Sequence, residues 1–460
     1  MPEISKYKLI VGKNPTYNER RAAVFIAEKI KIVTGYAIDV LTDDSPVGEC
    51  EIIVGVTERE TILGVDFRRC RERLFEYELR YVGKKLFVTG LGTSEEIFRE
   101  PYNAYAPVKD CGIGTLYAAH RFCEKVLGYD FIYVSHLDAL VDKAPENILI
   151  DESCALCVSC DKLSVELPEK FDGAALYSIP PASSLDVARS SLIFKNTYGE
   201  FVVYDGGARR DAERLCDILC YLSNGKKPIV RAWLISRLGE NHSGALCEIC
   251  EKGELAEKIE IKDIYCRFMS DGFVKKTAPK GCDTGRLLSD RDILLGAHER
   301  TGAVVHTVVR GDVISAGELC AEIIRVPCDD LEALEKVSAF DASVVYKISS
   351  DEKQSILLLG DAEKYTSREL EEMLDELRSN VLLLGHHGRA SVSQKCFDAI
   401  GADVYIAQTT NKIWYSEESS SARVPIYRFR RYLGELGKKR ENVYRDTEGI
   451  LSFTLPISCR

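Results

Sequence analysis

The stretch NVLLLGHHGRAS, Asn380 to Ser391, joins a short apolar run to two adjacent histidines and a glycine. A run of this kind predicts a buried strand, and the histidines then fall in the loop at its end. Other apolar runs end in a similar way, since FVVYDGG leads to Asp205 and SILLLGD leads to Asp361. Because imidazole and carboxylate groups are common ligands of divalent metals, these loops predict a metal site.

The sequence around this stretch alternates between hairpins and helices. Hairpins are predicted for SSLIFKNTYGEFVVYDGG, VVHTVVRGDVISAGELCAEIIRVP and SVVYKISSDEKQSILLLGD, and helices for DAERLCDILCYLSNG and SRELEEMLDEL. Two sheets covered on the outside by such helices form a four-layer αββα sandwich. The loops at one edge would then meet in a common cleft, where a bound divalent ion activates water for hydrolysis.

This half of the chain resembles the metallo-β-lactamase superfamily, and within it the hydrolase branch that includes competence-type DNA-uptake proteins. The matching segments are SSLIFKNTYGEFVVYDGG, AWLISRLGENHSGAL, SVVYKI, SILLLGDAEK, LLLGHHGRAS and VYRDTEGILSFTL. Their order and spacing cover about residues 190–455. The resemblance implies an αββα metallo-β-lactamase domain, which we place at residues 186–460.

The family's main ligand loop reads His-x-His-x-Asp-His, and this chain departs from it at three positions. The matching residues run from Arg237 to His242 in the order Arg-Leu-Gly-Glu-Asn-His. Arg237 and Gly239 replace the first two histidines, Asn241 replaces the aspartate, and His242 is kept. A guanidinium cannot lose its proton in a protein, so Arg237 opposes a dication in this pocket.

The remaining ligand positions are better preserved. The resemblance implies that Asp361 is the metal-bridging aspartate, and that His386 or His387 is the final ligand, with His386 the usual one. Asp341 is the ligand type available at the intervening position. Asp361 and Asn241 are the candidate catalytic residues. Three further residues are expected to support the site without holding the metal: Asp205, His387 and Arg237.

The first part of the chain predicts a smaller α/β domain at residues 1–140. Helices are expected at about 18–34 and 114–126, among short strands. The segments AAVFIAEKIKIVTGYAIDV, EIIVGVTER, ELRYVGKKLFVTG and GIGTLYAAHRFCEKVLGYDFIYV resemble the non-catalytic N-terminal domain of family 20 and family 67 glycosidases. No barrel pattern follows, so the resemblance implies an accessory domain without glycosidase activity. Residues 141–185 are expected to form a connector, with strand character in KLSVEL.

The composition narrows the function classes. The 460 residues carry a net charge of −11, which argues against general binding to nucleic acid or anionic membranes. Neither a signal-peptide core nor an apolar run of membrane-spanning length is found, so a cytoplasmic protein is expected. The 17 cysteines are then expected to be reduced thiols. Cys154, Cys157 and Cys160 have a spacing that a cysteine metal site would also use, and packing is the alternative.

Two classes of function stay open from the sequence. One is a binding or scaffold protein with an eroded metal site and weak or absent hydrolase activity, whose cleft holds a small anionic or phosphoester ligand. The other is a divergent hydrolase that uses one divalent ion, zinc or manganese, at His242, Asp361 and His386. A pocket without any metal, in which Asp361 pairs with Arg237, is the structural alternative. The substrate, partner and oligomeric state are not predicted.

Overall fold

The computed structural model describes residues 1–92, 113–129, 143–182, 185, 187–278, 283–328, 339–351, 354–388, 392–415 and 442–458. The chain divides into two compact units. Unit 1 comprises Met1–Lys162 and Tyr415–Gly437, and unit 2 comprises Leu163–Trp414 and Lys438–Arg460. Among the described residues, no helix combines the length and apolar character needed to cross a membrane.

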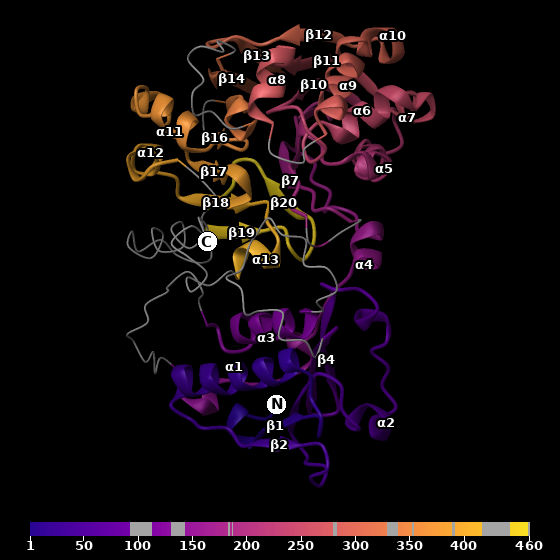
Figure 1. Cartoon of the computed structure of the whole chain (residues 1–460), viewed down its shortest axis with the longest axis vertical. Coiled ribbons are helices and arrows are strands. Elements are labelled where there is room, and N and C mark those ends of the chain that lie inside the picture. Colours follow the sequence, from indigo (N-terminus) through magenta and orange to yellow (C-terminus); the bar gives the residue numbers. More distant parts are fainter. Residues whose placement is uncertain are drawn as a thin grey trace. The chain divides into compact units, whose positions relative to one another are not determined.

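Unit 1 contains a six-stranded mixed sheet in the order β2-β1-β3-β5-β4-β6. Its strands are β1 (Lys8–Val11), β2 (Val40–Thr42), β3 (Glu51–Val54), β4 (Tyr77–Val82), β5 (Lys85–Gly90) and β6 (Leu156–Val158). Helices α1 (Tyr17–Thr34) and α3 (Gly114–Lys125) lie side by side against it (Figure 1). The short helix α2 (Arg59–Leu63) and the turn Arg69–Arg71 follow β3. Both expected helices are confirmed, whereas the apolar segment DFIYV at 130–134, where a further short strand is expected, lies outside the described residues.

The start of α1 shows how local sequence fixes this unit. Thr16 accepts a hydrogen bond from the Glu19 N–H, and the Glu19 carboxylate accepts one from the Thr16 N–H. This reciprocal pair satisfies two N–H groups that the first helical turn leaves without partners. The other Glu19 oxygen accepts from the Val56 N–H at 2.8 Å, which ties the helix to the end of β3.

Unit 2 contains two seven-stranded sheets. Sheet 1 has the order β12-β11-β10-β9-β8-β7-β20, and sheet 2 has the order β13-β14-β15-β16-β17-β18-β19. Sheet 1 consists of β7 (Ala175–Ser178), β8 (Ser191–Lys195), β9 (Phe201–Asp205), β10 (Ile229–Leu234), β11 (Glu260–Cys266), β12 (Val304–Thr307) and β20 (Leu451–Thr454). Sheet 2 consists of β13 (Val313–Ala316), β14 (Leu319–Arg325), β15 (Val345–Ser350), β16 (Gln354–Leu358), β17 (Val381–Leu383), β18 (Val404–Ala407) and β19 (Val443–Arg445).

The two sheets pack face to face, and alternation along the strands explains why. In β9, Val202 and Tyr204 face sheet 2, whereas Phe201 and Val203 face the helices on the outside. A strand buried on both faces needs apolar residues at every position, and FVVY supplies them. The helices outside sheet 1 are α5 (Ala212–Leu222), α6 (Gly244–Glu251), α7 (Gly253–Lys258), α9 (Thr284–Leu295) and α10 (Ala297–Thr301).

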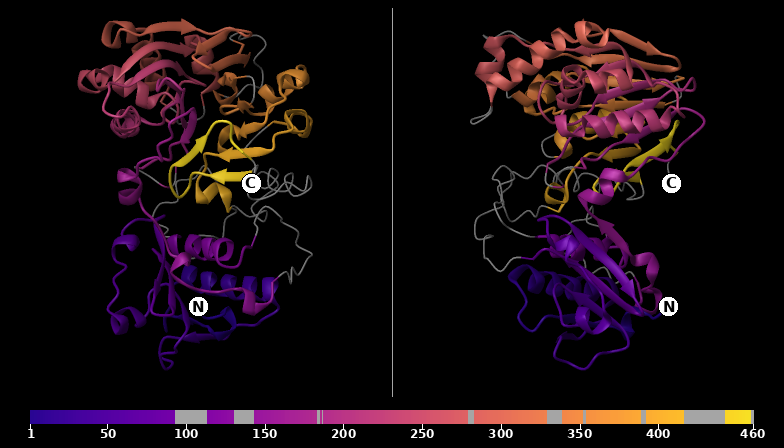
Figure 2. Two further views of the ribbon diagram at one scale, coloured as in Figure 1. Left: turned by 180° about the vertical axis from the view of Figure 1, so that it is seen from behind. Right: turned by 90° about the vertical axis from the view of Figure 1, so that its right-hand side faces the viewer.

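Helices α11 (Lys364–Leu370) and α12 (Gln394–Ile400) accompany sheet 2 on its other side (Figures 1 and 2). The short helices α8 (Asp271–Thr277) and α13 (Asn411–Trp414) complete the unit. The arrangement is helix, sheet, sheet, helix. The predicted four-layer αββα architecture is therefore confirmed for unit 2.

The boundaries differ from those expected. The segment expected to be a connector, 141–185, supplies β6 to the sheet of unit 1 and β7 to sheet 1 of unit 2. The prediction of a strand in KLSVEL is wrong, because helix α4 (Cys160–Val165) covers most of this segment. Ser159 accepts a hydrogen bond from the Lys162 N–H at 3.2 Å, which is how a serine starts a helix.

Candidate functional site

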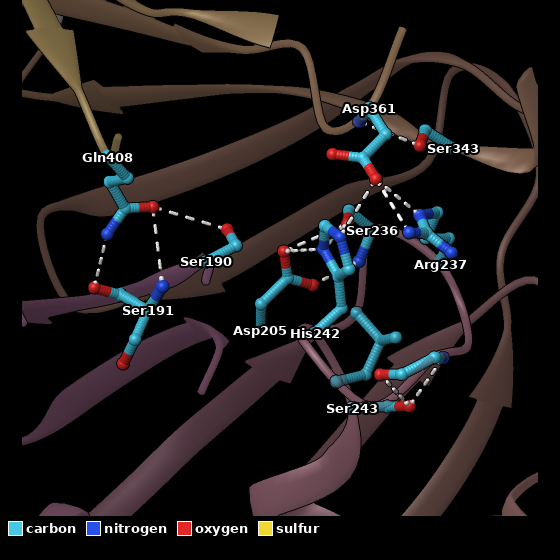
Figure 3. A network of polar contacts seen from close by, with 12 residues as sticks. Ser190, Ser191, Asp205, Ser236, Arg237, His242, Ser243, Ser343, Asp361 and Gln408 are labelled. Atoms are coloured by element: carbon cyan, nitrogen blue, oxygen red, sulfur yellow. Dashed lines mark hydrogen bonds and ion pairs between the residues drawn. The ribbon is translucent and has the colours of Figure 1, made fainter. Parts of the chain in front are cut away.

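The candidate site lies where strands of both sheets end. Asp205 closes β9, and Arg237 and His242 follow β10 in sheet 1. Asp361 follows β16 and His387 follows β17 in sheet 2. Figure 3 shows Asp361 reaching toward His242 and Arg237, so residues from the two sheets meet here. The loops that the sequence predicted to converge do converge.

Asp205 holds His242 in a fixed orientation. Its Oδ2 lies 2.9 Å from Nδ1 of His242, and its carboxylate also accepts hydrogen bonds from the N–H and hydroxyl of Ser236 at 2.8 and 2.9 Å. The carboxylate requires a proton on Nδ1 of His242, so the ring presents Nε2 to the other side. There Nε2 lies 3.1 Å from Oδ2 of Asp361. Asp205 therefore orients the His242 ring from the side away from Asp361.

Arg237 contacts the same oxygen of Asp361 as His242 does. Its Nε donates a hydrogen bond to Oδ2 of Asp361 at 2.8 Å, and Nη2 lies 2.7 Å from the same oxygen. A Cβ atom at Gly239 would come within 3.0 Å of Nη1 of Arg237. The guanidinium thus lies over the glycine that stands at the family's second histidine position. Phe340 covers it from another side, with its ring center 5.2 Å from the guanidinium carbon.

His387 faces the second oxygen of Asp361. Its Nδ1 lies 3.0 Å from the backbone carbonyl of Gln408, which can only accept, so Nδ1 carries the proton. In the neutral imidazole Nε2 then carries no proton, and it lies 3.7 Å from Oδ1 of Asp361. That oxygen is buried and has no hydrogen-bond partner within the described part of the chain. Two acceptor atoms at this spacing leave room for a shared cation between them.

His386, which the sequence predicted as a ligand, lies apart from this group. Its Nδ1 is 3.0 Å from a Glu363 carboxylate oxygen, and its ring stacks on Phe340 with centers 4.4 Å apart. His387, and not His386, lies with His242 and Asp361, where one potential ligand atom from each falls within 4.8 Å of the others. Both histidines have positive φ, 47° and 56°, and this backbone path decides which ring reaches Asp361.

Two other expected site residues make contacts that hold loops in place. Asp341 is buried and accepts hydrogen bonds from the N–H and hydroxyl of Thr366, both at 2.9 Å. The backbone carbonyl of Asn241 accepts a hydrogen bond from the Ser190 N–H at 3.0 Å. Neither contact reaches Asp361. Asp341 therefore fastens its loop to the start of α11, and Asn241 links the ligand loop to the start of β8.

The cysteines spaced three residues apart do not form a group of potential metal ligands within the described residues. Cys154, Cys157 and Cys160 are free thiols. In the parts of the chain that the structure describes, His242, Asp361 and His387 form the one group of three potential metal ligands. Burial raises the pKa of each of the three thiols. Packing is the role that these cysteines show.

Several residues at the site have a strained backbone with positive φ. Six described non-glycine residues have positive φ, and Asp205, His386 and His387 are three of them. Each such conformation costs about 1–3 kcal/mol, and it persists where the surrounding structure imposes it. Asp205 at φ 59° also accepts a hydrogen bond from the Trp233 indole through its backbone carbonyl. The surrounding structure therefore imposes unfavorable backbone conformations that orient these side chains.

Positive groups of the protein itself compensate the charge of Asp361. Burial raises the pKa of Asp361, but His242, Arg237 and His386 outweigh it and hold that pKa well below its usual value. Burial lowers the pKa of His242, but Asp361 and Asp205 outweigh it and raise the pKa to about 8. At neutral pH the two carboxylates thus face two cations, Arg237 and protonated His242.

The donor set fits one divalent ion and does not fit two. Two imidazole nitrogens and one carboxylate suit zinc or manganese, and Oδ1 of Asp361 lacks any other partner among the described residues. A second ion would need ligands from positions 237 and 239. There the chain offers a guanidinium and no side chain, and the guanidinium already holds Oδ2 of Asp361.

Sequence reasoning missed three residues of the site. Phe340 stacks on both Arg237 and His386, Glu363 pairs with His386, and Gln408 holds His387. Gln408 directly follows the parallel strand β18, and Glu363 comes two residues after Asp361. The rule that located Asp361, a polar residue just after a parallel strand, would also have found Gln408.

Comparisons with known proteins give limited similarity. No protein-family model matches the chain, and no curated protein matches it. Among solved structures, the metallo-β-lactamase fold protein YhfI from Bacillus subtilis is 10% identical, with a TM-score of 0.36 over 61% of this chain and 99% of that protein. A diphosphatase of the PhnP family is 14% identical, with a TM-score of 0.34 over 61% of this chain and 97% of that one.

The diiron β-hydroxylase CmlA from Streptomyces venezuelae is 10% identical, with a TM-score of 0.36 over 63% of this chain and 55% of that protein. Identities this low assign no activity to the chain.

Proposed function

We propose that unit 2 is a binding module of the metallo-β-lactamase fold that holds one divalent ion, and that it is a weak or inactive hydrolase. His242, Asp361 and His387 would hold the ion. One observation carries this proposal. Both histidines are fixed through Nδ1 and present Nε2 to opposite oxygens of one buried carboxylate. Histidine ligands are commonly oriented in this way by an acceptor on their other nitrogen.

The loss of two-metal chemistry follows from Arg237. Its guanidinium contacts Oδ2 of Asp361, the residue that the resemblance assigns to both ions. A fixed positive charge at this distance opposes a second dication. A single ion supplies Lewis acidity and water activation when it is bound. The chain itself contributes the orientation of both histidines and the neutralization of Asp361.

A small anionic or phosphoester ligand suits this pocket. Arg237 has five N–H donors, and within the described residues Nε and Nη2 contact Asp361 while Nη1 donates to the Leu238 carbonyl at 3.1 Å. The Arg237 side chain is 13% exposed, so it is not completely enclosed by the protein. A guanidinium binds carboxylate and phosphate oxygens through paired N–H groups.

A second candidate is a scaffold that holds no ion at all. The charges in the site support this candidate, because four side chains compensate one another through ion pairs and hydrogen bonds. They are Asp205, Asp361, Arg237 and protonated His242. In that case the site stabilizes the fold and the cleft binds a partner without metal.

Metal analysis of protein purified without chelator tests the proposal. We expect one equivalent of zinc or manganese, lost in His242→Ala, and little turnover of bis(4-nitrophenyl) phosphate with added Zn²⁺ or Mn²⁺. Two equivalents of metal, or turnover that disappears in His242→Ala, would overturn the weak-hydrolase assignment. Absence of bound metal at saturating Zn²⁺ and Mn²⁺ would favor the scaffold.

A further inference from the structure

Gln408 fastens the two sheets together beside the candidate site. It follows β18 of sheet 2 and is 2% exposed. Its Oε1 accepts from the Ser191 N–H and the Ser190 hydroxyl, both at 3.3 Å. Its Nε2 donates to the Ser191 carbonyl at 2.8 Å and to the Ser178 hydroxyl at 3.0 Å. Figure 3 shows this amide reaching across to Ser190 and Ser191. One side chain thus joins the end of β18 to the end of β7 and the start of β8.

The same residue controls His387 through its backbone. The Gln408 carbonyl accepts the Nδ1 proton of His387 at 3.0 Å, and Nε2 on the other side of the ring lies 3.7 Å from Oδ1 of Asp361. The position of this carbonyl depends on the chain just after β18. The side-chain bonds of Gln408 to sheet 1 hold that chain in place.

The candidate site needs this connection because its residues come from different sheets. His242 is anchored in sheet 1 by Asp205, whereas Asp361 and His387 belong to sheet 2. The two imidazole rings have centers 5.9 Å apart. Their spacing therefore depends on how the sheets are aligned at this edge, where Gln408 makes its four bonds.

We infer that Gln408 is a positioning residue, which sets the tautomer of His387 and its distance from His242. This inference rests on the proposed function for its effect on an ion. Its effect on His387 is independent of any ion. Residues that orient a metal-binding histidine commonly change metal affinity 10–100-fold when they are replaced.

The variant Gln408→Met tests this role, because methionine keeps the length of the side chain and removes all four bonds. Gln354→Met is the matched control. Gln354 is also a buried glutamine of sheet 2, and it exchanges hydrogen bonds of 2.7 and 2.8 Å with the backbone of Ile457. It stands at the start of β16, at the far end of the strand from Asp361.

Two measurements are made on both full-length variants. The first is ¹⁵N NMR of the imidazoles without metal, with His387 assigned from His387→Asn. The second is the affinity for Mn²⁺ and Zn²⁺. We expect Gln408→Met to shift His387 toward a mixture of tautomers and to weaken ion binding about 10-fold. Gln354→Met is expected to change neither.

The outcomes separate the two proposals. Equal effects of both variants, or an unchanged His387 signal in Gln408→Met, would overturn the role of Gln408. If the wild-type chain binds neither ion, the proposed function fails, and the NMR comparison still decides the inference. Should Gln408→Met not fold, Ser190→Ala removes one of the four bonds and is expected to give a smaller shift in the same direction.

Discussion

Arg237 holds one oxygen of Asp361 through two nitrogens, with Nε at 2.8 Å and Nη2 at 2.7 Å from Oδ2. The Asp361 carboxylate is 2% exposed, so it needs a compensating charge in the folded protein. A metal ion supplies that charge in a metal site. Here an arginine supplies it, and the site is complete enough to fold without an ion.

Replacing Arg237 with methionine should therefore lower the stability of the metal-free protein and raise its affinity for a metal ion. Methionine keeps contact with Phe340 but leaves Asp361 with less compensation. We expect the free energy of unfolding without metal to fall by about 2–3 kcal/mol, because one partner of a largely buried pair is lost. Affinity for Zn²⁺ should rise about 10-fold or more, since a nearby positive charge is removed. Urea denaturation and metal titration measure the two effects.

Arg231→Met is the control for this variant. Arg231 pairs with Glu200 at 2.6 Å, but its side chain is 45% exposed and lies outside the site. Exposed pairs contribute about 0–1 kcal/mol, so little change is expected. Unchanged Zn²⁺ affinity in Arg237→Met would contradict the view that the arginine competes with an ion.

The adjacent histidines provide a second comparison. We expect His387→Asn to weaken ion binding at least about 10-fold, because His387 faces the unpartnered oxygen of Asp361. His386→Asn should have a smaller effect, since His386 contacts Glu363 and Phe340. Asparagine tolerates positive φ, so both variants keep the backbone. Isothermal titration with Zn²⁺ distinguishes them, and a larger loss in His386→Asn would restore the ligand expected from the sequence.

The sequence predicted the layers and the position of the site well, because both depend on patterns that read directly from the chain. Apolar runs in β9 and β16 must be buried, and residues that follow parallel strands of a sheet must meet at one edge. That Arg237 and Gly239 offer no metal-ligating side chain was also visible from residue identities. None of this required knowledge of side-chain directions.

The choice between His386 and His387 could not be made in this way. Both residues adopt positive φ, so the loop does not follow a regular path that would let spacing predict direction. The helix at Cys160–Val165 was missed for a related reason, because the Ser159 cap outweighed the strand character of the apolar residues. Hydrophobic periodicity does not predict conformations that are set by single hydrogen bonds or by local strain.

Reintroducing histidines should not rebuild a two-metal site, because the loop backbone has changed as well. Gly239 has φ 149°, a conformation that residues with a side chain rarely adopt. We expect the double variant Arg237→His/Gly239→His to bind no more than one equivalent of Zn²⁺ and to lose stability. Gly239→Ala alone should already destabilize the protein, because an L side chain is strained at this φ whatever space is available. Two equivalents of Zn²⁺ in the double variant would show that the backbone is not the obstacle.

Asp446 predicts a pH dependence of stability. It follows β19, is 1% exposed, and accepts hydrogen bonds from the Ser178 hydroxyl at 3.1 Å and the Thr409 N–H at 3.3 Å. Burial raises its pKa to about 7 despite these two bonds, which lower it. An aspartate in an unfolded chain has a pKa of about 3.9. Between these values the folded protein keeps a proton that the unfolded chain has lost.

The sign follows from that difference in bound protons. The contribution of Asp446 to stability is greatest below about pH 4 and declines as the pH rises toward 7, by at most about 1.4 kcal/mol per pH unit. Asp446→Asn mimics the protonated carboxyl at every pH. We therefore expect the variant to gain stability relative to wild type between pH 5 and pH 7 in urea denaturation. Asp217→Asn, at an exposed pair with Lys258, should not show this trend, and parallel curves for Asp446→Asn and wild type would refute it.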